Sequence, residues 1–174
     1  MCLYHDKQLT QKLNKRMSKK HGKKVFYKIV KTFGPEVDDV SYLSYISGKF
    51  YSPWQEYTLS IVFGKNMVSD RTTQEAGKDK YDICWPTQIN RGIHVYLNRK
   101  DAVAAMEKMY IERPENFNRE GKNNRGFVKP KLAFIRVEAN QKDLVSCGND
   151  SFTNKENGVV FMKVFVPKQT PKSV

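Results

Sequence analysis

The stretch NRGIHVYLNRKDAVAAM, residues 90–106, predicts a strand that passes directly into a helix. In its first half, apolar side chains occupy every second position at Ile93, Val95 and Leu97, which is the period of a strand. His94 points to the other face of this strand. The sequence leaves two roles open for it, a ligand-contacting residue or a core histidine bonded to backbone.

The second half of the stretch carries the signals of a helix start. Asn98 is a good N-cap, and the negative charge of Asp101 suits the first turn of a helix. The helix is expected to run to about Arg113, because Pro114 cannot continue it. Its expected buried stripe consists of Ala102, Ala105, Met106 and Met109.

Four other segments have the β-branched and aromatic content of strands, namely 25–31, 57–63, 131–139 and 159–167. The last of them is apolar on both faces apart from Lys163, which predicts a central place in a sheet. Residues 40–54 fit either a short helix or an irregular strand. The polar segments 64–86 and 144–158 are expected to be loops.

The two long helical patterns do not alternate regularly with the strand patterns along the chain. This order favours a single α+β domain, with a mixed or mainly antiparallel twisted sheet and one or two helices, over a doubly wound fold. The expected division is a basic helix within 1–24, the domain itself at 25–167, and a frayed tail at 168–174.

Charge is the strongest signal in the composition. The 174 residues carry 31 Lys and Arg against 18 Asp and Glu, and the net charge of +13 favours a polyanionic partner such as nucleic acid or an acidic protein surface. An N-terminal helix is expected over 7–21, with Gly22 as its stop and a narrow apolar stripe of Leu9, Leu13 and Met17. Beside this stripe lie the first candidate contacts, Lys12, Lys15, Arg16, Lys19 and Lys20.

A second basic segment is the loop expected at 113–131. It places three basic side chains near two aromatic rings: Arg119, Lys122 and Arg125 beside Phe117 and Phe127. Arginines bind phosphates and aromatic rings stack on unpaired bases, so the helix and the loop together suit contact with nucleic acid. The alternative is that both segments are only solvated basic surface.

Several classes of function lack support in the sequence. The three cysteines, Cys2, Cys84 and Cys147, show neither metal-type nor disulfide-type spacing, which suits a reducing compartment. No phosphate-binding glycine loop and no metal-spaced histidine cluster occurs. Without a signal-peptide pattern or an apolar run of membrane length, a cytoplasmic location is expected, or the host cytoplasm or nucleus for a viral protein.

The stretch GIHV, residues 92–95, followed by an alanine-containing helix, resembles the strand-then-helix element of the ADP-ribosyltransferase fold in poly(ADP-ribose) polymerases. The resemblance implies that His94 stands where a tyrosine stacks on the nicotinamide of NAD, and that Glu156, or Glu138 as a second choice, polarises the ribose. The early strand of that family offers a histidine or arginine, whereas this chain offers Lys28 for the NAD phosphates. The layout is also similar to uncharacterised single-domain proteins of phages, viruses and bacteria.

Two functional expectations follow. The first is a non-enzymatic basic binding protein, of phage or viral type and without a cofactor or metal, that contacts nucleic acid or an acidic protein surface. The second is an ADP-ribosyltransferase-like enzyme that uses NAD, in which His94 and Glu156 serve catalysis and Lys28 contacts phosphate. Because the early strand of this chain lacks the histidine or arginine of that family, the binding protein is preferred over the enzyme.

Overall fold

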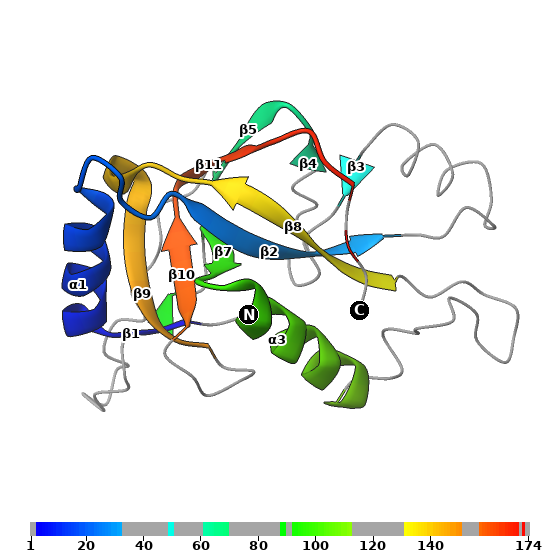
Figure 1. Ribbon diagram of the computed structural model, residues 1–174. Helices are drawn as coiled ribbons and strands as arrows, with labels where there is room; N and C mark the ends of the chain where they lie inside the picture. Colours follow the sequence, from blue (N-terminus) through cyan, green and yellow to red (C-terminus); the bar gives the residue numbers. More distant parts are fainter. Residues whose placement is uncertain are drawn as a thin grey trace, which may run out of the picture.

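The computed structural model describes residues 3–32, 49–50, 61–69, 88–89, 92–112, 131–150, 157–170 and 172. Within these residues the chain forms a single α+β domain, in which a large antiparallel sheet carries one helix on each side (Figure 1). The expected fold class is confirmed at this level.

The helices are Lys7–Met17 (α1) and Arg99–Glu112 (α3), with a short 3-10 turn at Gln141–Asp143. The strands are Leu3–His5 (β1), Val25–Thr32 (β2), Lys49–Phe50 (β3), Ile61–Val62 (β4), Lys65–Val68 (β5), Gln88–Ile89 (β6), Ile93–Tyr96 (β7), Lys131–Glu138 (β8), Leu144–Asp150 (β9), Gly158–Phe161 (β10) and Lys163–Val166 (β11). The main sheet has the order β5-β11-β8-β2-β7-β10-β9-β1-β6, and β3 pairs with β4.

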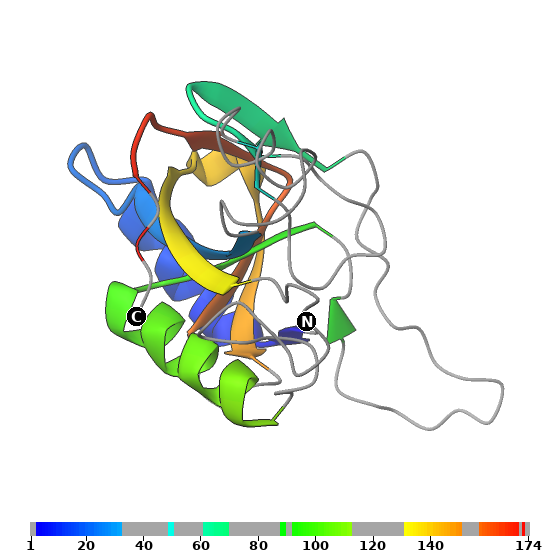
Figure 2. The same ribbon diagram turned by 90° about the vertical axis from the view of Figure 1, so that its right-hand side faces the viewer.

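The connection between β10 and β11 shows that the sheet is strongly curled. Only Met162 separates these two strands along the chain, yet β8, β2 and β7 lie between them in the sheet. In a flat sheet they would stand roughly 19 Å apart, four strand spacings, whereas two residues of chain span at most about 7 Å. The strands therefore curve around a common centre until the two halves meet (Figure 2).

This connection also corrects one expectation from the sequence. The single central strand expected at 159–167 is in fact two strands. β10 is central, because it pairs with β7 and β9, whereas β11 pairs with β8 and with the edge strand β5. The chain thus leaves one part of the sheet at Met162 and enters another.

The concave face of the curled sheet holds the main core. It gathers buried side chains from β2, β5, β7, β8, β9, β10 and β11, and Leu13 and Met17 of α1 pack onto it. Near its centre, the rings of Phe26 and Phe161 meet edge-on with their centroids 4.8 Å apart. Because strands from both halves of the sheet contribute, this single cluster holds the curl closed.

The convex face carries α3. The expected stripe is confirmed, since four side chains of α3 are fully buried: Ala102, Ala105, Met106 and Met109. They pack on Ile29, Tyr96, Leu132 and Phe134 of the strands β2, β7 and β8. The helix begins directly after Asn98, as predicted. The Asn98 amide donates to the Asp101 carboxylate at 3.0 Å, and the Ala102 N–H donates to the Asn98 carbonyl oxygen at 3.2 Å.

α1 is fastened to β9 at its first turn. The side chain of Asp6 caps the helix by accepting a hydrogen bond of 2.9 Å from the N–H of Leu9. The Thr10 hydroxyl donates to the Asp6 carbonyl oxygen and accepts from the N–H of Cys147, at 2.7 and 2.9 Å. These bonds fix the direction in which α1 leaves β1 and therefore which of its faces is exposed.

α1 is shorter than expected. It ends at Met17 rather than near residue 21. Gly22 is therefore not the helix stop that was predicted, because the C-cap is Ser18. Gly22 is nevertheless close to the last turn, since a side chain there would collide with the carbonyl oxygens of Arg16 and Met17. The backbone therefore turns back on the last helical turn at this glycine.

Two segments expected to be loops contain strands. β5 pairs along its whole length with β11, and β9 pairs with β10 on one side and with β1 on the other. Both strands depend on partners that are distant along the chain. The expected element at 40–54 is described only at 49–50, where it is strand, and the strand expected at 57–63 is described only from Ile61.

Candidate functional site

His94 lies on the convex face of β7 and is only 8% exposed. Its Nδ1 is 3.2 Å from the carbonyl oxygen of Gly92, and its Nε2 is 3.0 Å from that of Ile89. A neutral imidazole has one N–H, so it donates to one of these carbonyls at a time. Burial lowers the pKa of His94 from 6.5 to about 4, and the two carbonyls, which favour the protonated ring, offset this only in part. The ring is therefore a neutral core group at pH 7.

Lys28 lies on the opposite, concave face, between Phe26 and Val30, and is 3% exposed. Its ammonium donates a hydrogen bond of 3.3 Å to the backbone carbonyl oxygen of His94. Burial lowers its pKa to about 8, so the side chain still carries a charge at pH 7. A charged group in an apolar core is costly, because the core replaces little of the water that it loses.

The bond from Lys28 marks a place where two strands separate. β2 and β7 pair at Tyr27 opposite Tyr96. Continuing that antiparallel register would place Ile29 opposite His94, but the two strands are not paired there, and the His94 carbonyl accepts from Lys28 instead. Lys28 thus satisfies a backbone group that the sheet leaves open.

The NAD-binding arrangement implied by the resemblance is not assembled in the described part of the chain. The imidazole of His94 and the ammonium of Lys28 lie on opposite faces of the sheet and meet only through the His94 backbone. Glu138 stands at the end of β8 and forms a partly exposed ion pair of 3.4 Å with Arg136. Glu156 lies outside the described residues.

The expected basic row on α1 borders a hollow in the surface, which we call the α1 groove. The hollow has a volume of about 370 Å³ and is lined by Leu9, Lys12, Leu13, Lys15, Arg16, Lys19, Leu97 and Cys147. Four of the five basic residues predicted on this helix therefore line one site, and Lys20 does not. The loop residues Arg119, Lys122 and Arg125 lie outside the described residues.

A second groove was not foreseen from the sequence. It lies between β8 and the segment 167–172, and we call it the β8–tail groove. Its volume is about 590 Å³, and it is lined by Tyr27, Arg99, Phe134, Arg136, Pro167, Lys168, Gln169, Thr170 and Lys172. Its described lining residues thus include four cations and two aromatic rings, and none of them carries a carboxylate.

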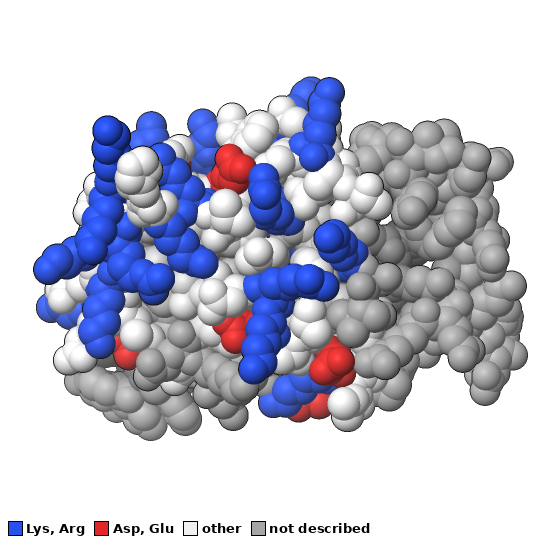
Figure 3. Space-filling view, in the orientation of Figure 1, with Lys and Arg blue, Asp and Glu red and all other residues white. Residues whose placement is uncertain are grey.

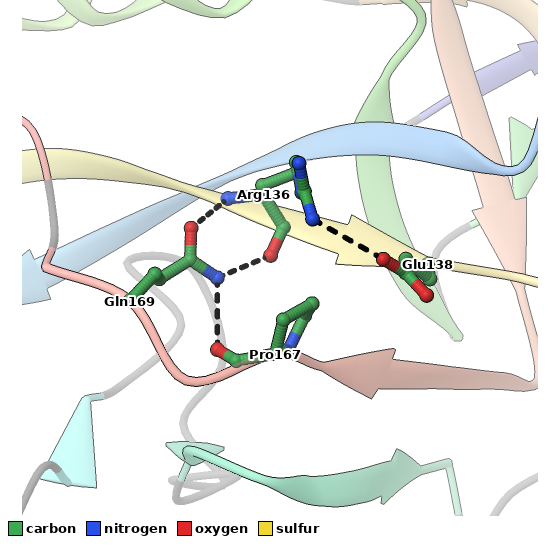
Figure 4. Close-up of polar contacts among 4 residues, drawn as sticks. All are labelled: Arg136, Glu138, Pro167 and Gln169. Carbon is green, nitrogen blue, oxygen red and sulfur yellow. Dashed lines mark hydrogen bonds and ion pairs between the residues drawn. The ribbon is translucent and has the colours of Figure 1, made fainter.

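The wall of the β8–tail groove is held by a side-chain amide (Figure 4). Oε1 of Gln169 accepts a hydrogen bond of 2.7 Å from the N–H of Arg136, and Nε2 of Gln169 donates to the carbonyl oxygens of Arg136 and Pro167. Further along, Phe134 and Lys172 exchange two backbone hydrogen bonds of 2.9 and 3.1 Å. The tail expected to fray at 168–174 is therefore fixed against β8 at Gln169 and Lys172.

A planar cation covers the floor of this groove. The Arg99 guanidinium carbon lies 5.3 Å from the centroid of the Phe134 ring, which is only 4% exposed. Tyr27 meets the same ring edge-on at 6.2 Å and is itself partly exposed. Arg99 is the first residue of α3, is exposed, and lines the groove.

The two grooves lie on either side of the turn between β7 and α3, since Leu97 lines one and Arg99 the other. Lys23 lies close enough to Arg16 and Asp101 for both charges to act on it. Its pKa is lowered by burial and then by the charge of Arg16, and is raised by Asp101 at the start of α3. In the face of the molecule drawn in Figure 3, Lys and Arg gather over α1 and across the middle, with few Asp or Glu among them.

Other kinds of site find no support in the described residues. They contain no group of three or more His, Cys, Asp or Glu placed to hold a metal ion. Neither α1 nor α3 is long and apolar enough to cross a membrane. Comparison of the chain with protein-family models, curated proteins and solved structures gave no match, so its function has to be inferred from its own residues.

Proposed function

We propose that the protein is a non-enzymatic nucleic-acid-binding protein, and that single-stranded nucleic acid binds in the β8–tail groove. The observation that carries the proposal is the position of Arg99, whose guanidinium covers Phe134 beside the partly exposed Tyr27. A base that stacks on Arg99 would extend this pair into a three-layer stack, and Tyr27 offers a second surface beside it. The remaining cations of the groove would meet the phosphates of the same strand, and Arg136 would exchange its exposed ion pair with Glu138 for a phosphate.

Single-stranded nucleic acid fits these groups better than a duplex or an acidic protein does. Only an unpaired base presents a free face for stacking, because the bases of a duplex stack on each other. An acidic protein would satisfy Arg136, Lys168 and Lys172, but it would make no use of an exposed guanidinium plane next to a tyrosine ring. Stacking and phosphate contacts are nearly independent of sequence, so we expect weak sequence preference and strong salt dependence.

The experiment is fluorescence polarisation with labelled oligonucleotides over a series of salt concentrations. The probes are dT and rU 20-mers and a mixed-sequence DNA duplex of the same length. The test variant is Arg99→Glu with Lys172→Glu, and the matched control is Lys20→Glu with Lys24→Glu, which changes the charge equally at exposed positions outside the groove. A glutamate at the first position of α3 suits the helix dipole, so the test variant is expected to fold.

We expect the single-stranded probes to bind more tightly than the duplex. The test variant should weaken this binding by about 30-fold or more, because a stacking plane is lost at Arg99 and a phosphate contact becomes repulsive at Lys172. The salt slope should fall by about 0.7, the value for one phosphate contact on a single strand. The control should change this binding by less than about threefold. Equal losses in the two variants, or no binding at low salt, would show the proposal to be wrong.

The alternative, an ADP-ribosyltransferase-like domain that uses NAD, has less support. Stacking of nicotinamide on His94 would require the ring to leave a buried position in which both nitrogens face backbone carbonyls. Incubation with labelled NAD and a cell extract tests this alternative. Hydrolysis or label transfer that is lost on Glu156→Gln would establish it in place of the binding protein.

A further inference from the structure

The α1 groove differs chemically from the β8–tail groove. Its floor is aliphatic, formed by Leu9, Leu13 and Leu97 with the thiol of Cys147, and none of its described lining residues is aromatic. Its rim carries four cations, Lys12, Lys15 and Arg16 on α1 and Lys19 just beyond the end of the helix. A row of cations beside an apolar floor matches a ligand that is acidic and apolar together.

Two kinds of polyanion fit this groove poorly. Nucleic acid would place its phosphates at the rim and leave the aliphatic floor without a partner, since none of the described lining residues offers a ring to receive a base. A membrane surface would need exposed apolar side chains on α1, but Leu13 and Met17 are buried in the core and Leu9 is mostly covered. The apolar surface of this groove is recessed, and an inserting side chain has to reach it.

We propose that the α1 groove binds an acidic amphipathic segment of a partner protein. Bulky aliphatic or aromatic side chains of that segment would enter the hollow, and its Asp and Glu would pair with the rim. The volume of about 370 Å³ lies at the lower end of the range of about 300–1,000 Å³ for ligand pockets, so one or two large side chains would fill it. Burial of those side chains supplies affinity, and the charges supply orientation and a fast encounter.

The test selects the ligand instead of assuming its sequence. A displayed library of random 15-residue peptides is enriched on the full-length protein and counter-selected on the variant Lys15→Glu with Lys19→Glu. The peptides that remain are then measured by polarisation against both proteins and against the control Lys20→Glu with Lys24→Glu, whose residues do not line the hollow. Leu9→Ala tests the floor separately, because it removes apolar surface and leaves every charge in place.

The expected peptides are rich in Asp and Glu and carry bulky apolar residues. They should bind at least tenfold more weakly to the Lys15→Glu, Lys19→Glu variant and about fivefold more weakly to Leu9→Ala, with the control unchanged. Recovery of only non-acidic peptides, or of acidic peptides that lack apolar residues and ignore Leu9→Ala, would overturn the proposal.

A dT 20-mer and vesicles of phosphatidylglycerol and phosphatidylcholine are measured against the same variants. If Lys15→Glu with Lys19→Glu weakens one of these probes while no peptide depends on it, the groove serves that other polyanion and the proposal is wrong. This outcome is distinct from failure of the nucleic-acid proposal, which is decided by Arg99 and Lys172. The two grooves can therefore be judged independently.

Discussion

Lys28 in the interior and Lys172 at the β8–tail groove are the same residue type in opposite environments. Lys28 is 3% exposed, and its ammonium bonds to a backbone carbonyl at the place where β2 and β7 separate. Lys172 is exposed, and backbone bonds to Phe134 fix its position while its side chain stays free to meet a ligand. His94 and Tyr27 repeat this contrast, since the imidazole faces backbone and the phenol faces a groove.

The difference shows that a polar residue in a strand is not by itself evidence of a site. His94 and Lys28 stand out in the sequence because they interrupt apolar strands, and both serve the backbone in the structure. The residues that can reach a ligand are ordinary cations held in place by others, as Gln169 holds the backbone beside Arg136. The predictions below set the buried pair against the groove, and they begin with the largest effect.

Acid should destabilise the protein through His94. Its folded pKa of about 4 lies below the usual 6.5, so the unfolded chain binds more protons between these values and the free energy of unfolding falls as the pH falls. The full effect is about 3 kcal/mol, present above pH 6.5 and lost by about pH 4. Urea unfolding from pH 4 to 7 measures it. His94→Gln replaces the imidazole N–H by an amide N–H donor that does not titrate, and should flatten the profile, whereas His21→Gln at an exposed position should not.

If His94→Gln and the unchanged protein lose stability equally between pH 6.5 and 4, the imidazole is not the dry group described here. Such a result would also mean that His94 is accessible to a ligand.

Replacing Lys28 by methionine should stabilise the protein at pH 7. Burial lowers the pKa of Lys28 from 10.5 to about 8, which corresponds to a cost of about 3 kcal/mol for keeping the ammonium charged in the folded protein. Removing the ammonium also leaves the His94 carbonyl without a donor, which costs about 1 kcal/mol. We therefore expect Lys28→Met to raise the free energy of unfolding by about 2 kcal/mol. The unchanged protein should also gain stability from pH 8 to 10.5, as the folded state releases its proton first.

Chemical denaturation at pH 7 and pH 10 tests this, with Lys24→Met as the exposed control. The charge of Lys28 also lowers the pKa of His94, so Lys28→Met should move the acid transition of His94 to higher pH. A destabilised Lys28→Met would show that the hydrogen bond to His94 stabilises the fold by more than burial of the charge costs.

The sequence predicts those parts of the fold that local pattern encodes. α1, α3, β2, β7 and β8 each carry a helical or strand period. α3, β2, β7 and β8 occur close to their expected bounds, and α1 begins as expected but ends early, at Met17. β9 is polar and glycine-containing, and it becomes a strand because β10 and β1 pair on both sides of it. Gly148 is required there, since a side chain would collide with the Tyr4 carbonyl. The switch at Met162 is equally non-local, because nothing in its neighbours distinguishes a corner from a continuous strand.

The same distinction separates the two grooves. The rim of the α1 groove is visible in the sequence, because residues three and four apart share a helix face. The β8–tail groove collects residues from β2, α3, β8 and the tail, and no spacing along the chain connects them. A pairing of Arg99 with Phe134 could be found only once the convex face of the sheet was known.

Within the β8–tail groove, Tyr27 is expected to act as a stacking surface. Tyr27→Leu keeps an apolar side chain on β2 but removes the ring, so single-stranded DNA should bind about tenfold more weakly, from the usual stacking energy per base. The salt slope should not change, because no cation is lost. Tyr27→Phe, which keeps the ring, is the matched control and should bind as the unchanged protein does. A loss with Tyr27→Phe as large as with Tyr27→Leu would assign the effect to the hydroxyl and remove stacking from the account.

The smallest effect is expected at Gln169, which shapes the groove without contacting a ligand. Gln169→Glu keeps the oxygen that accepts a hydrogen bond from the Arg136 N–H. It removes the amide N–H groups that donate to the carbonyl oxygens of Arg136 and Pro167, so about 1 kcal/mol of stability should be lost. The new charge also repels phosphate, and Gln169→Leu separates the two effects because it removes the amide without adding charge. Both variants should increase hydrogen exchange at Arg136 and Lys172, and Gln169→Leu should weaken single-stranded DNA by only about threefold. Unchanged exchange in Gln169→Leu would show that the backbone bonds between Phe134 and Lys172 hold the tail alone, and that the groove is a property of the sheet rather than of this amide.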